Sequence, residues 1–175
     1  MNIVLLDRKL HDRSQFDCNV KALNNYLRLM ANQQSAKDNS RTYVLEDKKD
    51  SKIILGFYTL TMSRVDNSLL PDNLQKKHQL VESSGLIARL AVDKNHVGKG
   101  YGEMLLVDAL DKLDQASKVV GFPFVMVDAK DGVSEFYLKY GFIPFKNQKN
   151  KLFLPLATYR KAIEQNCHIV LIHSR

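Results

Sequence analysis

The sequence has few of the features that mark secreted, metal-binding or membrane proteins. Its two cysteines, Cys18 and Cys167, stand far apart and without metal-ligand spacing, which supports neither a disulfide nor a zinc site. The apolar run near the N-terminus is short and is interrupted by Asp7 and Arg8, unlike a signal peptide. No segment approaches the length of a membrane span. We therefore expect a cytoplasmic protein that uses no metal ion and contacts no membrane.

The sequence also lacks low-complexity linkers and internal repeats. Its 175 residues, of which 45% are hydrophobic, suit one domain with a sizeable core. We therefore predict a single domain over residues 1–175. Residues 166–175 are expected to form either an additional strand or a tail.

Acidic residues are scarce in the last part of the chain. The formal net charge of the whole sequence is +7, with a pI near 9.4. Residues 139–175 contain seven lysines and arginines and one glutamate, a net charge of +6. A basic surface attracts a polyanion such as RNA, and Lys146, Lys149 and Lys151 are the candidate contacts. The alternative is a solvated basic surface without a partner.

Apolar periodicity predicts an α/β order of elements. Strands are expected at 3–6, 42–45, 53–61, 86–92, 124–127 and 152–154, and helices at 20–30, 104–113 and 133–140. Asp17 or Asn19 is the expected cap of the first helix and Asp131 of the last, which Gly141 would end. The polar stretch 64–84 is expected to be an excursion with a short helix at most. The strand, turn, helix and strand between residues 86 and 127 form one βαβ crossover.

The turn inside this crossover is rich in glycine. Gly98, Gly100 and Gly102 follow the strand directly and precede the helix, and glycine permits both positive φ and close backbone approach. Unpaired N–H groups at such a helix start can hold a phosphate. The turn lacks the hydroxyl residue of a nucleotide-hydrolase phosphate loop and the glycine spacing of a dinucleotide fold. A cofactor pyrophosphate site and a plain strand-to-helix turn both stay open at this point.

The segment Val97-Gly98-Lys99-Gly100-Tyr101-Gly102 resembles the Q/R-x-x-G-x-G/A motif of GNAT acetyltransferases, with valine in place of the first Gln or Arg. The resemblance implies a GNAT fold, in which helices flank a mixed, mostly antiparallel central sheet. It implies acetyl-coenzyme A as cosubstrate. The implied contacts are Leu90, Ala91, Val92, Val97, Gly98, Lys99, Gly100, Tyr101 and Gly102. Coenzyme A is itself a polyanion and is a further explanation for the basic charge.

Five segments together resemble the GNAT toxins of bacterial toxin-antitoxin pairs. In chain order they are HDRSQFDCNVKALNNYLRLMA, GFYTL, ARLAVDKNHVGKGYGEMLL, VDAKDGVSEFYLKYGF and KLFLPLA. The resemblance implies transfer of an acetyl group to the α-amino group of aminoacyl-tRNA, which blocks translation. It also implies a homodimer, a ribbon-helix-helix antitoxin, and contact with operator DNA only through the antitoxin complex.

The chemistry needs a neutral amine, a polarised carbonyl and a proton for the leaving thiolate. Residues 86–92 include no carboxylate or histidine that could act as a base, which favours an α-amino group over a lysine as acceptor because its pKa is lower. A backbone N–H near Leu90 to Val92 would polarise the carbonyl. The resemblance places the catalytic tyrosine at Tyr137, which would act as general acid, and Tyr140 is the natural control.

Three further interpretations stay open. Arg89 either contacts substrate or antitoxin or is a surface or salt-bridge residue. The enzyme could instead be a GNAT that acetylates a protein amine or a small polyamine, or the fold could serve a regulator without activity. The residues name neither the acetylated aminoacyl-tRNA nor the antitoxin interface.

Overall fold

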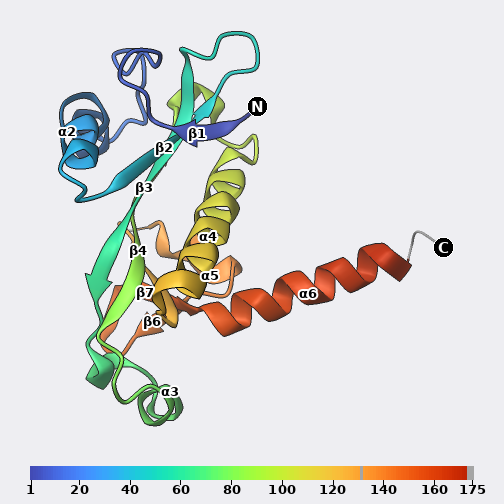
Figure 1. Ribbon diagram of the computed structural model, residues 1–175. Coiled ribbons are helices and arrows are strands. Elements are labelled where there is room, and N and C mark those ends of the chain that lie inside the picture. Colours follow the sequence, from blue (N-terminus) through green and yellow to red (C-terminus); the bar gives the residue numbers. More distant parts are fainter. Residues whose placement is uncertain (131, 173–175) are drawn as a thin grey trace. The chain divides into compact units, whose positions relative to one another are not determined.

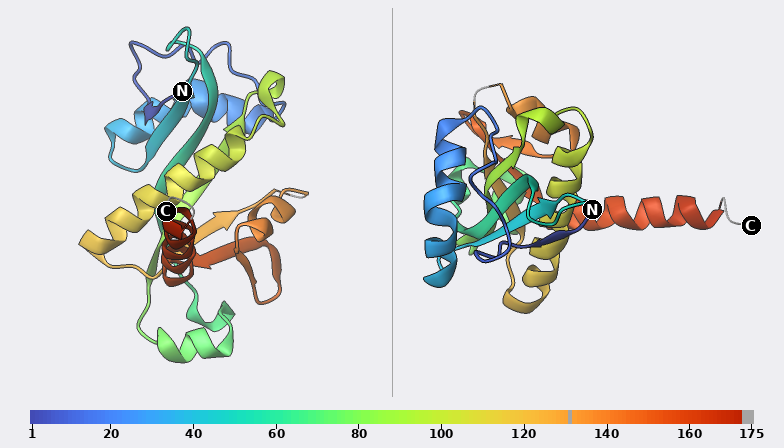
Figure 2. Two further views of the ribbon diagram at one scale, coloured as in Figure 1. Left: turned by 90° about the vertical axis from the view of Figure 1, so that its right-hand side faces the viewer. Right: turned by 90° about the horizontal axis from the view of Figure 1, so that it is seen from above.

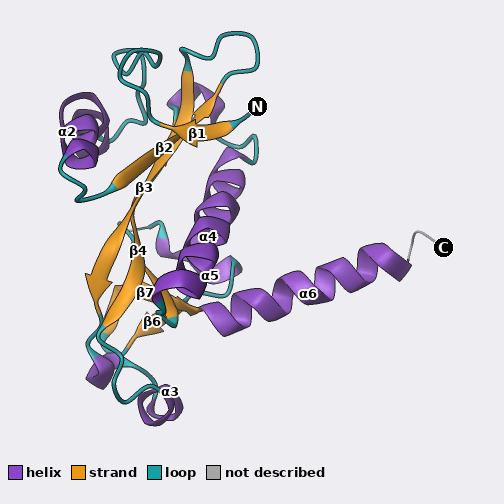
Figure 3. Cartoon of the chain, viewed as in Figure 1, coloured by secondary structure: helices purple, strands orange, loops and turns teal. Residues whose placement is uncertain are grey.

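The computed structural model describes residues 1–130 and 132–172 (Figure 1). Its strands are β1 (Ile3–Leu5), β2 (Arg41–Glu46), β3 (Ile54–Arg64), β4 (Ser83–Val92), β5 (Phe124–Asp128), β6 (Ile143–Phe145) and β7 (Gln148–Pro155). Its α-helices are α1 (Lys21–Asn25), α2 (Ala31–Ala36), α3 (Asp72–Lys77), α4 (Tyr101–Val120), α5 (Ser134–Lys139) and α6 (Leu156–Ile172). A π-helical turn, η1 (Tyr26–Met30), and two 3₁₀ turns, η2 (Asn67–Leu69) and η3 (Lys94–His96), complete the described elements (Figure 3).

The strands form one seven-stranded sheet in the order β1-β2-β3-β4-β5-β7-β6. The pairs β1–β2, β2–β3, β5–β7 and β6–β7 are antiparallel. Helix α4 joins β4 to β5, which is the crossover that the sequence predicts. The predicted α/β class with a mixed, mostly antiparallel sheet is confirmed.

The chain divides into two compact units, of which the first comprises residues 1–62 and 87–115. Strands β2 and β3 pair with Val44 opposite Phe57, and both side chains are fully buried. Phe16 packs edge-on against Phe57, with 5.3 Å between ring centroids. The helical segment 21–36 adds Leu27 and Ala31 to this core. Residues 54–59 of β3 are all buried, and the helical segment packs against this part of the sheet.

The first helical segment begins and ends differently from the prediction. Its first residue is preceded by Val20, which has extended backbone dihedrals and makes no side-chain capping bond, so neither Asp17 nor Asn19 is the cap. Asn19 instead has a φ of 61°, and Asp17 accepts hydrogen bonds from Asn19 N and Asn24 Nδ2. Helical structure then continues through η1 and α2 to Ala36. Asp17 has tertiary partners, which local capping rules do not include.

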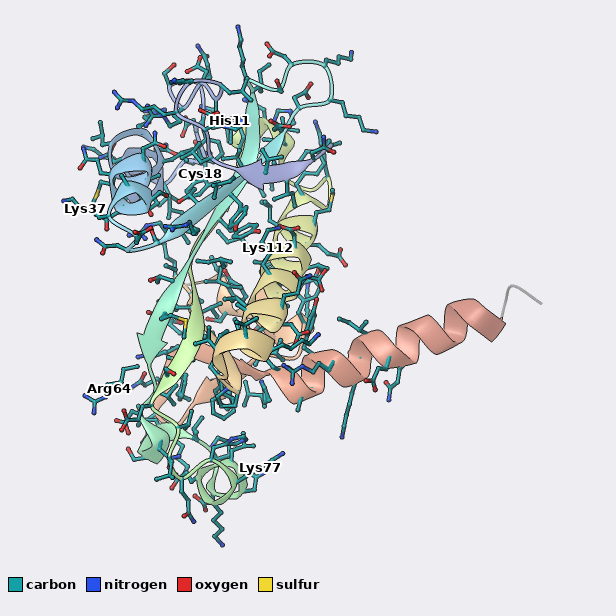
Figure 4. The ribbon with its side chains drawn as sticks, in the orientation of Figure 1. His11, Cys18, Lys37, Arg64, Lys77 and Lys112 are labelled. Atoms are coloured by element: carbon teal, nitrogen blue, oxygen red, sulfur yellow. The ribbon has the colours of Figure 1, made fainter. Side chains whose placement is uncertain are left out.

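Helix α4 packs closely on β3 within the first unit. A Cβ on Gly56 would lie 2.7 Å from Leu105 Cδ1 and 2.9 Å from Ala91 O, so only glycine allows this approach. One turn further along α4, Asp108 accepts a short hydrogen bond from the Tyr58 hydroxyl and one of 2.7 Å from Lys112 Nζ. Burial and the Asp108 carboxylate raise the pKa of Tyr58 above its usual value. Lys112 is labelled on α4 in Figure 4.

The second unit comprises residues 63–86 and 116–175. Strands β5 and β7 pair with Met126 opposite Phe153, and both side chains are buried. Phe153 also contacts the rings of Phe124 and Phe145, at centroid distances of 5.5 and 4.8 Å. The predicted strands 124–127 and 152–154 are confirmed, and Pro155 ends β7 as expected. The strand β6 was not predicted.

Three further predictions concern the second unit. The excursion 64–84 contains η2 and α3, in agreement with a short helix at most. Residues 166–172 continue α6 to Ile172, which corrects the predicted strand or tail, while 173–175 lie outside the described residues (Figure 2). Asp131, the expected cap of α5, also lies outside them, and Val133 occupies the position before that helix. Gly141 follows α5 with a φ of 84°.

None of the described helices combines the length and the apolar character needed to cross a membrane.

Candidate functional site

The turn between β4 and α4 has a backbone conformation that depends on two glycines. Gly98 and Gly100 have φ values of 81° and 78°, in the left-handed region, and a Cβ at either position would meet open space. Gly102 lies inside α4, where the φ is not positive. Glycines at alternating positions let successive N–H groups turn toward one point. The conformational requirement therefore applies to Gly98 and Gly100.

The start of α4 presents unpaired hydrogen-bond donors. The first backbone bond at the start of this helix runs from Met104 N to Gly100 O, at 3.1 Å. Within the described part of the chain, no acceptor pairs with the N–H groups of residues 98–103. Val97 and Lys99 beside them are exposed. The positive end of a 20-residue helix and a row of free donors thus lie at the predicted phosphate position.

Asp93 fixes the beginning of this turn. The residue is 5% exposed, and its Oδ1 accepts a hydrogen bond of 2.9 Å from Asn95 N while Oδ2 accepts one of 3.1 Å from Asp17 N. His96 Nδ1 lies 3.3 Å from the same Oδ1. Burial opposes ionisation, but these hydrogen bonds lower the pKa of Asp93 below its usual value. Both carboxylate oxygens are therefore occupied by groups that hold the turn in place.

Asp17 joins the same network from a distant part of the chain. Its Oδ2 accepts a hydrogen bond of 2.8 Å from Lys94 Nζ, and its Oδ1 accepts bonds from Asn19 N and Asn24 Nδ2 at 2.9 and 2.7 Å. The Lys94 ammonium and these donors hold the pKa of Asp17 well below its usual range. The backbone also contributes, because Lys94 N donates to Asp17 O at 2.8 Å.

The last residues of β4 form a regular strand end. Ala91 is 7% exposed and packs in the core of the first unit, whereas Leu90 and Val92 are half-buried. Asp93 N donates to Leu55 O at 2.9 Å, so pairing with β3 continues past Val92. The backbone predicted to polarise a carbonyl thus has a fixed position relative to the turn.

Arg89 has a partner inside the protein. Its guanidinium carbon lies 3.6 Å from the centroid of the buried Tyr26 ring, a cation–π contact. The Tyr26 hydroxyl lies 3.2 Å from Ser40 Oγ. The half-buried Arg89 thus has an aromatic partner inside the protein, and its contact with substrate stays a prediction.

Tyr137 lies in α5 of the second unit and is 6% exposed. Phe136 and Phe142 pack edge-on against its ring, with centroid distances of 5.1 and 5.5 Å. Burial raises the pKa of Tyr137 to about 12. The phenol is therefore fully protonated at neutral pH. Tyr140, half-buried at the end of α5, contacts Phe136 at 5.2 Å.

The three predicted lysines lie around the β6–β7 hairpin of the second unit but differ in their contacts. Lys146 Nζ donates to Asp72 Oδ1 at 2.6 Å, and Lys146 N donates to Leu69 O at 2.9 Å, which ties the hairpin to the excursion 64–84. Lys149 and Lys151 lie in β7 and make no ion pair with a described residue. The ammonium group of Lys146 is thus engaged, whereas those of the other two are available.

The sequence reasoning did not identify Gly56, Asp17 and Asp93 as residues that shape the turn. A glycine inside the apolar strand ILGFYTL is a signal of close backbone approach. An aspartate directly after a buried strand is a signal of a side-chain turn. The contact between Asp17 and Asp93, 76 residues apart, has no local signal.

Comparison with known proteins places these features in one family. Residues 38–144 match the Acetyltransferase (GNAT) domain. The Probable toxin TacT of Sinorhizobium fredii is 29% identical over 166 residues, which cover 89% of this chain and 91% of that protein. A tRNA-acetylating toxin of Mycobacterium tuberculosis is 30% identical over 132 residues, which cover 75% of this chain and 78% of that protein.

Solved structures resemble the chain over nearly its whole length. AtaT complexed with acetyl-methionyl-tRNAfMet has a TM-score of 0.85 and 30% identity, covering 93% of this chain and 98% of that one. A tyrosine-to-phenylalanine mutant of KacT has a TM-score of 0.83 and 33% identity, covering 94% and 97%. Further similar structures are AtaTR bound with AcCoA, AtaT bound to the C-terminus of the antitoxin AtaR, and the AtaT-AtaR complex bound to DNA, with TM-scores of 0.78, 0.78 and 0.74.

The domain match spans more than half of the sequence, and the chain therefore belongs to the GNAT acetyltransferase family. Its relatives include tRNA-acetylating toxins of toxin-antitoxin systems. The predicted family and enzyme class are confirmed.

The Asp17–Lys94 pair predicts a specific dependence of stability on pH. Because the pKa of Asp17 is lowered in the folded state, its stabilising effect is complete above the unfolded value of about 3.9 and is lost as the pH falls toward the folded value. Asp17→Asn should therefore lower the melting temperature at pH 7, and the difference from wild type should shrink below about pH 4. Thermal unfolding followed by circular dichroism measures both.

Lys94→Met is the matched variant, since it removes the same ion pair from the other side. It should also reduce stability at pH 7 and flatten the acid dependence. Equal melting temperatures of wild type and both variants at pH 7 would contradict a stabilising role for this pair.

Proposed function

We propose that this chain is a toxin that transfers the acetyl group of acetyl-coenzyme A to the α-amino group of an aminoacyl-tRNA and so blocks translation. The main support is the similarity to tRNA-acetylating relatives over nearly the whole chain, above all to AtaT complexed with acetyl-methionyl-tRNAfMet. The acetylated amine can no longer act as a nucleophile in peptide synthesis.

The cosubstrate is held by the turn before α4. The N–H groups of residues 98–103 bind the pyrophosphate, and the open space around Gly98 and Gly100 leaves room for it. Lys99 and Tyr101 flank this position. A backbone N–H within residues 90–92 polarises the thioester carbonyl. AtaTR bound with AcCoA supports this choice of ligand.

The acceptor amine attacks without a strong base from the protein. Asp93 is the carboxylate nearest to the end of β4 in sequence, and its two oxygens already accept hydrogen bonds from Asn95 N and Asp17 N. A lysine amine is only about one part in a thousand neutral near pH 7.4, whereas an α-amine is roughly a fifth neutral. An α-amino group therefore needs far less help, which favours an aminoacyl ester as acceptor.

Tyr137 supplies the proton for the leaving group. As the amine nitrogen bonds to the carbonyl carbon, the carbon–sulfur bond breaks and the Tyr137 hydroxyl gives its proton to the sulfur. The attacking nitrogen loses a proton to solvent, and the phenolate regains one from solvent. The raised pKa of Tyr137 keeps the hydroxyl protonated before each cycle. Structures of KacT and AtaT as tyrosine-to-phenylalanine mutants support the view that one tyrosine matters in these toxins.

The tRNA contacts are assigned to the basic residues of the second unit. Lys149 and Lys151 make no ion pair with a described residue and are the proposed phosphate contacts, while Lys146 acts through the hairpin that it ties to Asp72. Arg89, whose guanidinium lies over the Tyr26 ring, is proposed as a further substrate contact.

The proposed cellular setting follows the relatives. The complexes of AtaT with AtaR and of both with DNA support an antitoxin that covers the toxin and joins it to operator DNA. We infer a ribbon-helix-helix antitoxin, a homodimeric toxin and a cytoplasmic location.

The decisive experiment combines the purified protein, radiolabelled acetyl-coenzyme A and charged total tRNA. We expect label in the aminoacyl ester fraction, released as acetyl-amino acid by mild alkali. Uncharged tRNA should take up no label. Label in protein lysines or in spermidine, with none in charged tRNA, would assign the enzyme to the alternative class of acceptors.

The turn is tested by replacing Gly100. Gly100→Val should weaken acetyl-coenzyme A binding about tenfold in calorimetry, because a β-branched residue is strained at positive φ. Gly100→Asn is the matched variant, since asparagine tolerates the left-handed region, and should retain more affinity. Wild-type affinity in both variants would rule out the turn as the pyrophosphate site.

The general acid is tested by a pair of tyrosines in the same helical segment. Tyr137→Phe should lower kcat about a hundredfold or more, while acetyl-coenzyme A affinity stays near the wild-type value. Tyr140→Phe removes a hydroxyl from the end of the same helix and should keep most of the activity. Equal losses in the two variants would indicate a packing role for both rings.

A further inference from the structure

The excursion 64–84 forms the wall of a basic cavity in the second unit. A cavity of about 820 Å³ is lined by the end of α3, the segment 78–83, the residues before β5 and the first turns of α6. Its cations are Lys76, Lys77 and Arg160, and Glu82 is its carboxylate. The lining therefore carries an excess of positive charge.

The neighbouring cavity differs in charge. About 630 Å³ in volume, it shares the segment 79–82 with the first and is lined by Arg64 and Lys151 together with Asp66 and Glu82. Two cations and two carboxylates balance there. Hydrogen bonds from Ser68 lower the pKa of Asp66, and the positive charges of Arg64 and Lys151 lower it further. The excess of positive charge thus distinguishes the first cavity from this neighbour.

Two cations of the first cavity lie on the short helix α3. Lys76 and Lys77 form the last turn of α3, are exposed, and pair with no carboxylate among the described residues; Lys77 is labelled in Figure 4. The other end of α3 is fastened by the 2.6 Å bond between Asp72 and Lys146. Gln75 Nε2 also donates to Leu70 O at 2.8 Å.

The third cation is positioned by a hydrogen bond. Arg160 NH2 donates to Ser117 Oγ at 2.7 Å, which places the guanidinium beside the end of α4 in the cavity wall. Ser83 and Gln79 add neutral polar groups to the same lining. Lysine, arginine, serine and glutamine are side chains that contact phosphate and sugar oxygens in nucleic-acid complexes. The cavity is larger than one phosphate needs and suits a stretch of backbone.

We infer that this cavity binds the phosphodiester backbone of the tRNA substrate. The inference rests on the proposed function and assigns a role to the excursion 64–84. Lys76 and Lys77 neutralise phosphates, and Arg160 lies in the same lining. The site contributes to affinity and to position of the RNA body, so its loss should affect binding more than the chemical step.

The test compares two double charge reversals in the full chain. Lys76→Glu with Lys77→Glu should raise the Kd for uncharged tRNA, and the KM for charged tRNA, about tenfold near physiological salt, with kcat within about twofold of wild type. The slope of log affinity against log salt should fall by about one to two. Lys48→Glu with Lys49→Glu, two exposed lysines between β2 and β3, makes the same charge change and should leave the slope near wild type.

Three further measurements distinguish loss of tRNA binding from a defect in the chemical step, from a failure to fold and from loss of a site for an acidic protein segment. Acetylation of an amino-acid methyl ester, which has no RNA body, should be equal in wild type and both variants if this small acceptor is used. The neutral variant Lys76→Gln with Lys77→Gln should weaken tRNA binding in the same direction, and it serves if the charge reversal fails to fold. Loss of polyglutamate binding with unchanged tRNA binding would overturn the inference in favour of an acidic protein segment.

Equal tRNA Kd and equal salt slopes in the reversal and control variants would also overturn the inference. Failure of the proposed function has a different result. In that case wild type would acetylate no charged tRNA, whatever its affinity for uncharged tRNA. The Kd measurements need no acetyl transfer and therefore test the cavity separately.

Discussion

The unpaired N–H groups at the start of α4 are the feature on which the remaining architecture depends. Backbone donors can serve as a binding site only if the strand before them and the helix after them are both fixed. The first unit meets this condition twice. Leu105 lies over Gly56, where any other residue would collide. One turn later, Asp108 accepts a hydrogen bond from the Tyr58 hydroxyl. Much of the packing in this unit therefore serves the position of one short turn.

Asp93 presents an apparent conflict, since a carboxylate beside an anion site repels the ligand. This repulsion is reduced because Asn95 N and Asp17 N donate hydrogen bonds to the Asp93 carboxylate and partly compensate its negative charge. Lys94 balances the second carboxylate, Asp17, through a direct ion pair. The same arrangement removes Asp93 as a free base. An enzyme built in this way depends on an acceptor whose own pKa leaves enough neutral amine.

The features that could be predicted from the sequence are those with a local pattern. The run FVMV between a proline and a polar segment predicts β5, and the glycine turn followed by a helical apolar period predicts α4. The first helix has its period but not its cap, because Asp17 bonds to Lys94 and Asn24 instead of the helix start. Strand β6 is short and contains a proline, so its pairing with β7 is visible only in three dimensions.

Residue counts alone do not show which basic side chains are already paired with a carboxylate. Counting residues places the excess after residue 139, and Lys146 belongs to that group, yet its ammonium is paired with Asp72. Lys76 and Lys77 lie in the excursion, where the sequence alone offered no role, and no described carboxylate pairs with them. A cation attracts a polyanion only to the extent that its charge is not already balanced nearby. Lys146 therefore contributes mainly by fastening α3, and the lysines at the other end of that helix are the ones that we propose for RNA.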